Sequence, residues 1–138
     1  MAATALTRFE SRDRRPALES ALADSTAEVR AQAACAIETI GSRPSVMPLL
    51  AALAREPDEE VRDAVIHALG ASKDPAAVEG LVRALADSVP QLRESAAHML
   101  GMLSDERAVE PLIAATRDPD HEVRLTAVWA LDALEQSR

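Results

Sequence analysis

Aromatic residues and cysteine are scarce in this chain. Its 138 residues include one Phe, one Trp, one Cys and no Tyr. β-Sandwiches and β-barrels draw heavily on aromatic and β-branched residues, so this scarcity argues against an all-β fold. The single cysteine, Cys35, excludes a disulfide within the chain, and nothing in the sequence requires an oxidising compartment.

Long apolar segments are also missing. No apolar run reaches the roughly 18 residues that a membrane-spanning helix needs. Arg8 and Glu10 interrupt the apolar stretch that a signal peptide would require near the N-terminus. We therefore expect a cytoplasmic protein that does not enter a membrane, and the length predicts a single domain covering residues 1–138.

Positive charge is in deficit, with 15 Lys and Arg residues against 23 Asp and Glu residues and a net charge of -8. This balance argues against nucleic-acid binding, which draws on a basic surface. The first 15 residues are the exception, because they hold four arginines against Glu10 and Asp13. This short basic segment is either solvated terminal chain or a docking patch for an acidic partner.

The chain is rich in the helix formers Ala, Leu, Glu and Arg, and these residues are arranged in a repeat. A Val-Arg or Leu-Arg dipeptide recurs at residues 29–30, 61–62, 92–93 and 123–124, with spacings of 32, 31 and 31 residues. Apolar residues follow eight positions after the start of each dipeptide: Ile37, Leu69, Leu100 and Leu131. Because several columns keep one register, the sequence predicts a tandem repeat.

Each unit has the pattern of two helices joined by a polar turn. The turns are Asp24-Ser25, Glu56-Pro57-Asp58, Asp87-Ser88 and Asp118-Pro119-Asp120. Asp and Ser suit the N-cap of the second helix, which is expected to open at the dipeptide, while Gly70 and Gly101 suit its C-cap. We predict an all-α stack with repeats at 15–42, 43–73, 74–104 and 105–138, preceded by a half repeat at 1–14. Such a stack should unfold nearly as one unit.

The arginines of the four dipeptides form a column of their own. They are Arg30, Arg62, Arg93 and Arg124, and aspartates recur five residues before the start of a dipeptide at Asp24, Asp87 and Asp118. A phosphate site is one use of such a column. We expect the other use, a ladder of Arg–Asp pairs that links neighbouring units.

These motifs resemble the HEAT-like repeat family of the phycobilin-lyase type. The resemblance rests on the stretches 61–70 (VRDAVIHALG), 105–113 (DERAVEPLI) and 118–124 (DPDHEVR), and it covers about residues 16–135. It implies an α-solenoid of HEAT-like helical hairpins. The family includes bilin lyase subunits, an iron hydroxylase and bacterial proteins that only bind partners, so the fold does not choose among these functions.

The hydroxylase branch carries His-Glu pairs directly after the Val-Arg dipeptide in several units. Here the corresponding pairs are Ala31-Gln32, Asp63-Ala64, Glu94-Ser95 and Leu125-Thr126, and none is His-Glu. The one His-Glu pair, His121-Glu122, precedes the dipeptide and falls in the turn. The resemblance therefore does not extend to a di-iron site.

Helical geometry indicates which side of each second helix is free. In the second unit the core stripe is Val61, Val65, Ala68 and Leu69. Positions two, three and six residues after the start of the dipeptide point the other way, and in HEAT-like folds the second helices line the concave surface. The predicted partner-binding residues on this surface are Gln32, Cys35, Asp63, His67, Glu94, His98, Leu125 and Trp129.

Trp129 is the large apolar member of this set. Tryptophan is enriched in binding hot spots, so Trp129 is predicted to anchor a partner or a second copy of the chain. The second case would give a homodimer through the C-terminal repeat. The alternative is that Trp129 folds over the end of the stack and covers core atoms.

His67 and His98 lie one repeat apart in the same column. Packed helices are roughly 10 Å apart, so the two imidazoles could converge on a metal with Asp63 or Glu94 as a third ligand. The alternative is two half-exposed histidines on the wall of a groove. We predict no metal and no other cofactor.

Catalytic motifs are missing from the sequence. It contains no nucleophile-and-base set, no Gly-rich phosphate loop and no paired-cysteine motif. We therefore predict a non-enzymatic scaffold that binds another protein or a peptide through the concave face of its second helices. The alternative function is a bilin lyase-like or metal-binding enzyme subunit.

Overall fold

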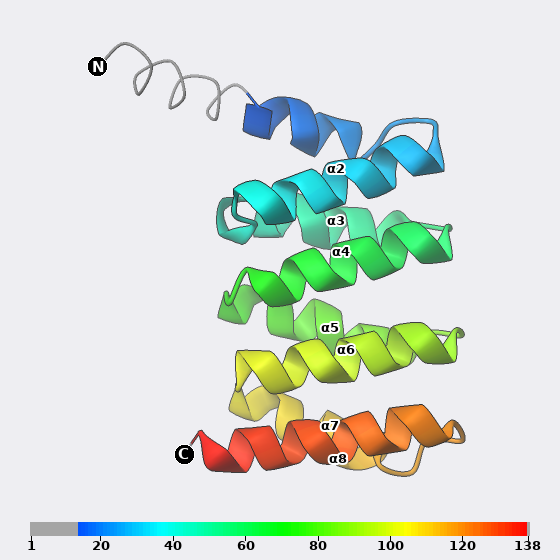
Figure 1. The fold of residues 1–138 in the computed structure, drawn as a ribbon, viewed down its shortest axis with the longest axis vertical. Helices are drawn as coiled ribbons and strands as arrows, with labels where there is room; N and C mark the ends of the chain where they lie inside the picture. Colours follow the sequence, from blue (N-terminus) through cyan, green and yellow to red (C-terminus); the bar gives the residue numbers. More distant parts are fainter. Residues whose placement is uncertain (1–13, 138) are drawn as a thin grey trace.

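Longer and shorter helices alternate along the chain. The computed structural model describes residues 14–137 and shows helices and turns, with no strand among them. The second helix of each hairpin is α2 (Ala27–Ile40), α4 (Glu59–Ala71), α6 (Pro90–Leu103) or α8 (His121–Gln136). These helices lie one above the other in chain order (Figure 1). The prediction of an all-α repeat stack is confirmed.

The first helix of each hairpin is shorter. Residues 14–21 are helical, and the later first helices are α3 (Val46–Arg55), α5 (Val78–Ala84) and α7 (Val109–Ala115). A 3₁₀ turn precedes each of these three: η1 (Arg43–Ser45), η2 (Pro75–Ala77) and η3 (Glu106–Ala108). Helices α3, α5 and α7 form a second layer behind α4, α6 and α8 (Figure 1). The half repeat predicted at 1–14 and the basic segment lie almost entirely outside the described residues.

The core runs between the two layers. The predicted stripe of the second unit is confirmed, because Val61, Val65, Ala68 and Leu69 are all buried. Large buried side chains of the first helices, such as Leu49, Leu81 and Leu112, belong to the same core and come from the other layer. Burial of such apolar surface is the main force that holds the hairpins together.

Gly70 and Gly101 do not cap their helices, so that prediction was wrong. Both lie inside a helix and are buried, while the C-caps are Ser72 and the left-handed Ser104. A Cβ atom on Gly101 would lie 2.7 Å from Cζ3 of Trp129 and 2.9 Å from Cα of Ala130. A Cβ atom on Gly70 would collide with Met99 in the same way. These glycines therefore allow neighbouring second helices to approach closely.

The second helices also begin earlier than the dipeptides. Helices α4 and α8 begin two residues before Val61 and Val123, and each follows an aspartate N-cap. Asp58 and Asp120 each accept hydrogen bonds from two free backbone N–H groups of the first turn. Helices α2 and α6 instead follow Thr26 and Val89, whose side chains form no capping bond, so the predicted capping holds for only two of the four turns.

A ladder of charged pairs links neighbouring hairpins, as predicted. Arg30 Nε lies 2.9 Å from Glu56, Arg62 Nε lies 2.9 Å from Asp87, and Arg93 Nε lies 2.9 Å from Asp118. Each arginine pairs with the turn of the following hairpin, and in one case the acid is Glu rather than Asp. The hydrogen bonds from Arg93 lower the pKa of Asp118 below its ordinary value. The ladder therefore fixes the order and spacing of the units.

Candidate functional site

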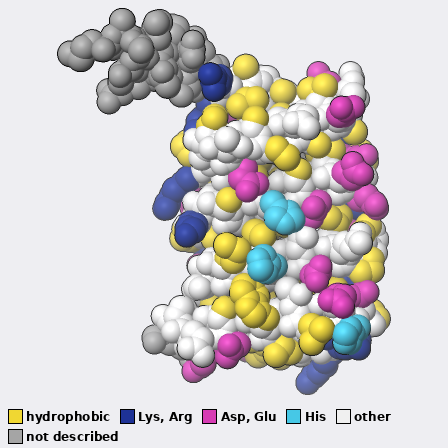
Figure 2. Space-filling model, in the orientation of Figure 1, with side chains coloured by type: hydrophobic (Ala, Val, Ile, Leu, Met, Phe, Trp, Pro, Cys, Tyr) yellow, Lys and Arg dark blue, Asp and Glu magenta, His cyan; other side chains and the backbone are white. Residues whose placement is uncertain are grey.

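The exposed side chains of α2, α4, α6 and α8 form one surface, which we name the second-helix face. It is the face that Figure 2 presents. The structure places all eight predicted residues on these four helices, and none of them is buried: Gln32, Cys35, Asp63, His67, Glu94, His98, Leu125 and Trp129. Their role in partner binding stays a prediction.

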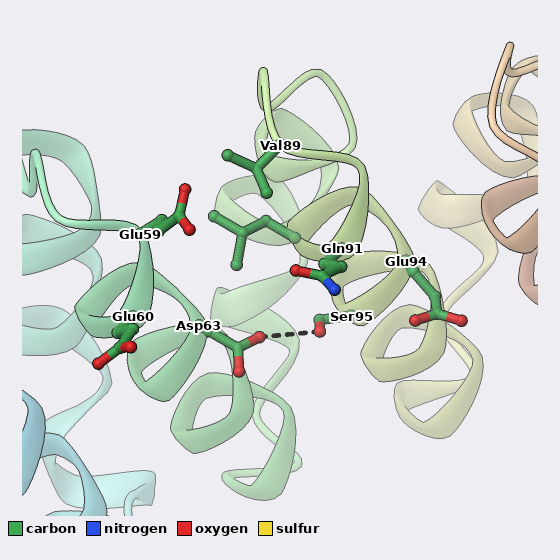
Figure 3. Close-up of a pocket in the computed structure, with 8 residues that line it drawn as sticks. Glu59, Glu60, Asp63, Val89, Gln91, Glu94 and Ser95 are labelled. Carbon is green, nitrogen blue, oxygen red and sulfur yellow. Dashed lines mark hydrogen bonds between the residues drawn. The ribbon is translucent and has the colours of Figure 1, made fainter.

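Three shallow hollows lie along this face. The first, between α2 and α4, has a volume of about 290 Å³ and includes Glu28, Gln32, Asp58 and Glu60 in its lining. The second, between α4 and α6, has a volume of about 270 Å³ (Figure 3). The third continues toward α8 with a volume of about 240 Å³. A bound chain lying across the helices could therefore contact several repeats at once.

The second hollow is lined mainly by carboxylates and amides. Glu59, Glu60 and Asp63 come from the start of α4, while Gln91 and Glu94 come from the start of α6 (Figure 3). Across all three hollows the lining includes six acidic residues and no Lys or Arg: Glu28, Asp58, Glu59, Glu60, Asp63 and Glu94. Figure 2 shows acidic side chains gathered along the same side of the face. We name these six residues the acidic margin.

Hydroxyl groups of the following helix hold two of these carboxylates in place. Ser95 Oγ donates a hydrogen bond of 2.8 Å to Asp63 Oδ1, and Thr126 Oγ1 donates one of 3.3 Å to Glu94 Oε2. Both bonds link a second helix to the next one along the stack. They hold Asp63 and Glu94 on the walls of the hollows, which lowers the side-chain entropy that these two residues would lose when a partner binds.

The two histidines predicted to bind a partner, His67 and His98, have different contacts. His67 Nδ1 lies 2.9 Å from the backbone oxygen of Asp63 in the preceding turn of α4. His98 stacks on Trp129, with 4.7 Å between the ring centroids and 15° between the ring planes. Trp129 also lies over Gly101, and 44% of its surface remains exposed. Trp129 therefore covers part of α6 and still offers an apolar surface to solvent.

The residues do not form a metal site of the kind considered from the sequence. In residues 14–137 no group of three or more His, Cys, Asp or Glu side chains could hold a metal ion. His67, Glu94 and His98 line the third hollow together without forming such a group. His121 and Glu122, the one His-Glu pair, are exposed at the start of α8. A di-iron centre does not fit these residues.

Some predicted residues remain separate from the hollows. Cys35 is exposed on α2, and Leu125 is 53% exposed on α8. Sequence reasoning missed most of the acidic margin, since the predicted partner-binding residues include only Asp63 and Glu94 from this set. A signal was nevertheless available. The residue directly before each dipeptide is acidic or an amide in all four units: Glu28, Glu60, Gln91 and Glu122.

Within the part of the chain that the structure describes, no helix is long and apolar enough to cross a membrane. Comparison with the curated proteins finds no match. Two solved structures share the fold. Human deoxyhypusine hydroxylase, solved in complex with glycerol, matches with a TM-score of 0.78 and 24% identity over 95% of this chain and 46% of its own. The complex of CpcE and CpcF of phycocyanin lyase from Nostoc sp. PCC7120 matches with a TM-score of 0.65 and 21% identity over 88% of this chain and 65% of that chain.

At these identities the likeness concerns the fold alone, and the chain spans less than two thirds of either neighbour's length. The family assignment comes from a different comparison. The family model described as HEAT repeats matches residues 15–100 and 79–138, which together cover nearly the whole described part. The chain belongs to the HEAT repeat family.

Proposed function

We propose that the protein is a non-enzymatic scaffold that binds a basic segment of another protein across its second-helix face. The observation that carries this proposal is the acidic margin. Its six carboxylates line consecutive hollows, and no Lys or Arg lines those hollows. A partner segment rich in Lys and Arg would complement this charge and would be attracted before contact.

The apolar end of the face supplies a different kind of contact. Trp129 and Leu125 are exposed on α8 beside the third hollow, whose lining includes His98 and Thr126. A large aromatic side chain that is already held by stacking loses little entropy when a partner covers it. We propose that the bound segment carries an apolar residue that packs against Trp129, next to its basic part.

The arrangement of the hollows on the second-helix face favours binding of a chain, because three small hollows of about 240, 270 and 290 Å³ lie in series along it. A larger hollow of about 600 Å³, which is within the range of about 300–1,000 Å³ usual for small-molecule sites, lies apart from this face between α3 and α5. A cytoplasmic location and the lack of nucleic-acid binding stay predictions.

A peptide-binding experiment tests the charge of the face. The purified chain is titrated with Lys- and Arg-rich peptides and with the same peptides carrying Glu in place of the basic residues, using Trp129 fluorescence and calorimetry. The test variant is Glu59→Lys with Glu60→Lys, in the first turn of α4. The control is Glu79→Lys with Glu110→Lys, in the first turns of α5 and α7, which changes the net charge equally outside the hollows.

We expect the native chain to bind only the basic peptides, and the test variant to bind them at least about tenfold more weakly than the control does. Trp129→Ala should weaken binding of peptides that also carry an apolar residue by a similar factor. Equal binding of both peptide sets, or equal weakening in both charge variants, would contradict the proposal. A bilin that binds to the purified chain would instead favour the lyase-like alternative.

A further inference from the structure

Each ladder arginine uses the two sides of its guanidinium group for different purposes. Nη1 donates to a backbone oxygen in the turn of its own hairpin, as Arg93 does to Asp87 at 2.7 Å. Nε and Nη2 donate together to a carboxylate of the next hairpin, as Arg93 does to Asp118 at 2.9 and 3.1 Å. Arg30 and Arg62 repeat both halves of this pattern.

Arg124 makes only the first half of these contacts. Its Nη1 lies 2.8 Å from the backbone oxygen of Asp118 and 3.1 Å from that of Pro119. Among residues 14–137, no acceptor pairs with its Nε or Nη2. The side of the guanidinium that binds a carboxylate in the three preceding units therefore remains available at the C-terminal end of the stack.

Asp24 shows the complementary situation at the other end. Its Oδ2 accepts from the backbone N–H of Thr26 at 2.9 Å. The carboxylates of Asp87 and Asp118 accept in the same way from the backbone N–H groups of Val89 and Asp120. Asp87 and Asp118 also each accept from an arginine of the preceding hairpin. Within the described residues no arginine donates to the carboxylate of Asp24, since Arg30 bonds to its backbone oxygen. The Asp24 carboxylate is therefore oriented like those of Asp87 and Asp118, but no guanidinium group donates to it.

Apolar columns agree with these charged ones. Five residues after the start of the dipeptide, Ala34, Ile66 and Ala97 are buried, whereas Val128 of the last unit is 56% exposed. At the first position of the dipeptide, the exposed residue belongs to the first unit instead of the last. Val61, Leu92 and Val123 are buried there, whereas Val29 of the first unit is 41% exposed. Within the described residues, the first and last hairpins therefore present the two halves of the interface that joins neighbouring hairpins.

We propose that these two ends bind each other in different copies of the chain. Arg124 of one copy donates Nε–H and Nη2–H to the Asp24 carboxylate of a second copy, and the apolar ends that carry Val128 and Val29 cover each other. The contact repeats the spacing of the units inside one chain. Because the surfaces that meet are different, the assembly is head-to-tail and grows into short chains. This proposal does not depend on the acidic margin or on the partner proposed above.

A pair of charge-reversal variants tests the contact on the full 138-residue chain. The weight-average mass is measured by sedimentation or light scattering over a wide range of concentration. Arg124→Glu places two carboxylates at the contact, and Asp24→Arg places two guanidinium groups there. An equimolar mixture of the two variants restores opposite charges at every contact. Arg55→Glu, at an exposed residue of α3, reverses a charge away from both ends and serves as the control.

We expect the mass of the native chain and of Arg55→Glu to rise with concentration. Each end variant alone should associate at least about tenfold more weakly, and their mixture should regain association. Circular dichroism of each variant checks that the helices remain folded. A native chain that stays monomeric at every concentration would overturn the proposal. The proposal would also be overturned if the mixture associated no better than either variant alone, or if the chain formed a closed dimer whose stability neither substitution changed.

Discussion

Gly101 and Gly80 are both buried inside helices, but a side chain at each would meet a different neighbour. At Gly101 an added Cβ atom would lie 2.9 Å from Cα of Ala130, which is backbone of α8 and cannot move alone. At Gly80 the close contact is the end of the Leu50 side chain, which can rotate away. At the residue scale, the distance between second helices thus depends on the absence of single methyl groups.

We expect Gly101→Ala to destabilise the protein and Gly80→Ala to leave it unchanged or slightly more stable. Overpacking costs about 1–3 kcal/mol, while Ala gains about 1 kcal/mol over Gly inside a helix. The net loss for Gly101→Ala should therefore be up to about 2 kcal/mol in the free energy of unfolding, measured in urea. Fluorescence of Trp129 should also change in this variant, because its ring lies over Gly101. A stabilised Gly101→Ala would mean that α6 and α8 are less tightly packed than described.

At the element scale, the four second helices have equivalent positions but different starts. Asp58 before α4 accepts from the backbone N–H groups of Glu60 and Val61, whereas Thr26 before α2 accepts from none with its side chain. Helix α4 therefore gains from its cap a stabilisation that α2 lacks.

Alanine substitution at the two N-caps should reveal this difference. Asp58→Ala leaves two N–H groups of α4 without their acceptor, and we expect a loss of about 1 kcal/mol in the free energy of unfolding. Thr26→Ala removes no capping bond and should cost a few tenths of a kcal/mol at most. Urea unfolding followed by circular dichroism measures both variants. Equal losses would show that the cap contributes nothing beyond the helix propensity of the side chain.

The sequence predicts elements better than it predicts contacts between them. The columns that start at Val29, Val61, Leu92 and Val123 locate all four second helices and the buried stripe, because burial imposes the helical period. The position of a glycine near a predicted helix end does not distinguish a C-cap from a close approach of two helices. Only the neighbouring helix decides this, and the residues that carry the information lie 28–29 positions further along the sequence.

On the candidate surface, too, the sequence predicts the positions of residues better than the contacts between them. Spacing places Asp63, His67, Glu94 and His98 on the second-helix face, as observed. It does not reveal that His98 stacks on Trp129, or that Ser95 holds Asp63, because these contacts depend on the offset between neighbouring helices. The Arg–acid ladder was predicted with aspartates alone. Glu56 was overlooked, although its carboxylate takes the place in its own turn that an aspartate takes in the others.

At the scale of the whole molecule, each hairpin depends on its neighbours. Contacts between second helices run through the stack from α2 to α8, and a charged pair crosses each of the three junctions between described hairpins. A short array with such junctions is expected to unfold nearly as one unit. Trp129 allows a direct test, because the chain has one tryptophan and it lies at the last junction.

Arg30→Ala removes the pair at the first junction, far along the stack from Trp129. If the hairpins unfold together, this distant change lowers the urea midpoint of Trp129 fluorescence as much as that of circular dichroism. Arg93→Ala, at the junction next to α8, should also move both midpoints together. Arg55→Ala removes an exposed side chain that forms no ion pair among the described residues and should move neither. A fluorescence midpoint that stays fixed in Arg30→Ala while circular dichroism shifts would mean that the hairpins unfold separately, since coincident transitions are the mark of two-state unfolding.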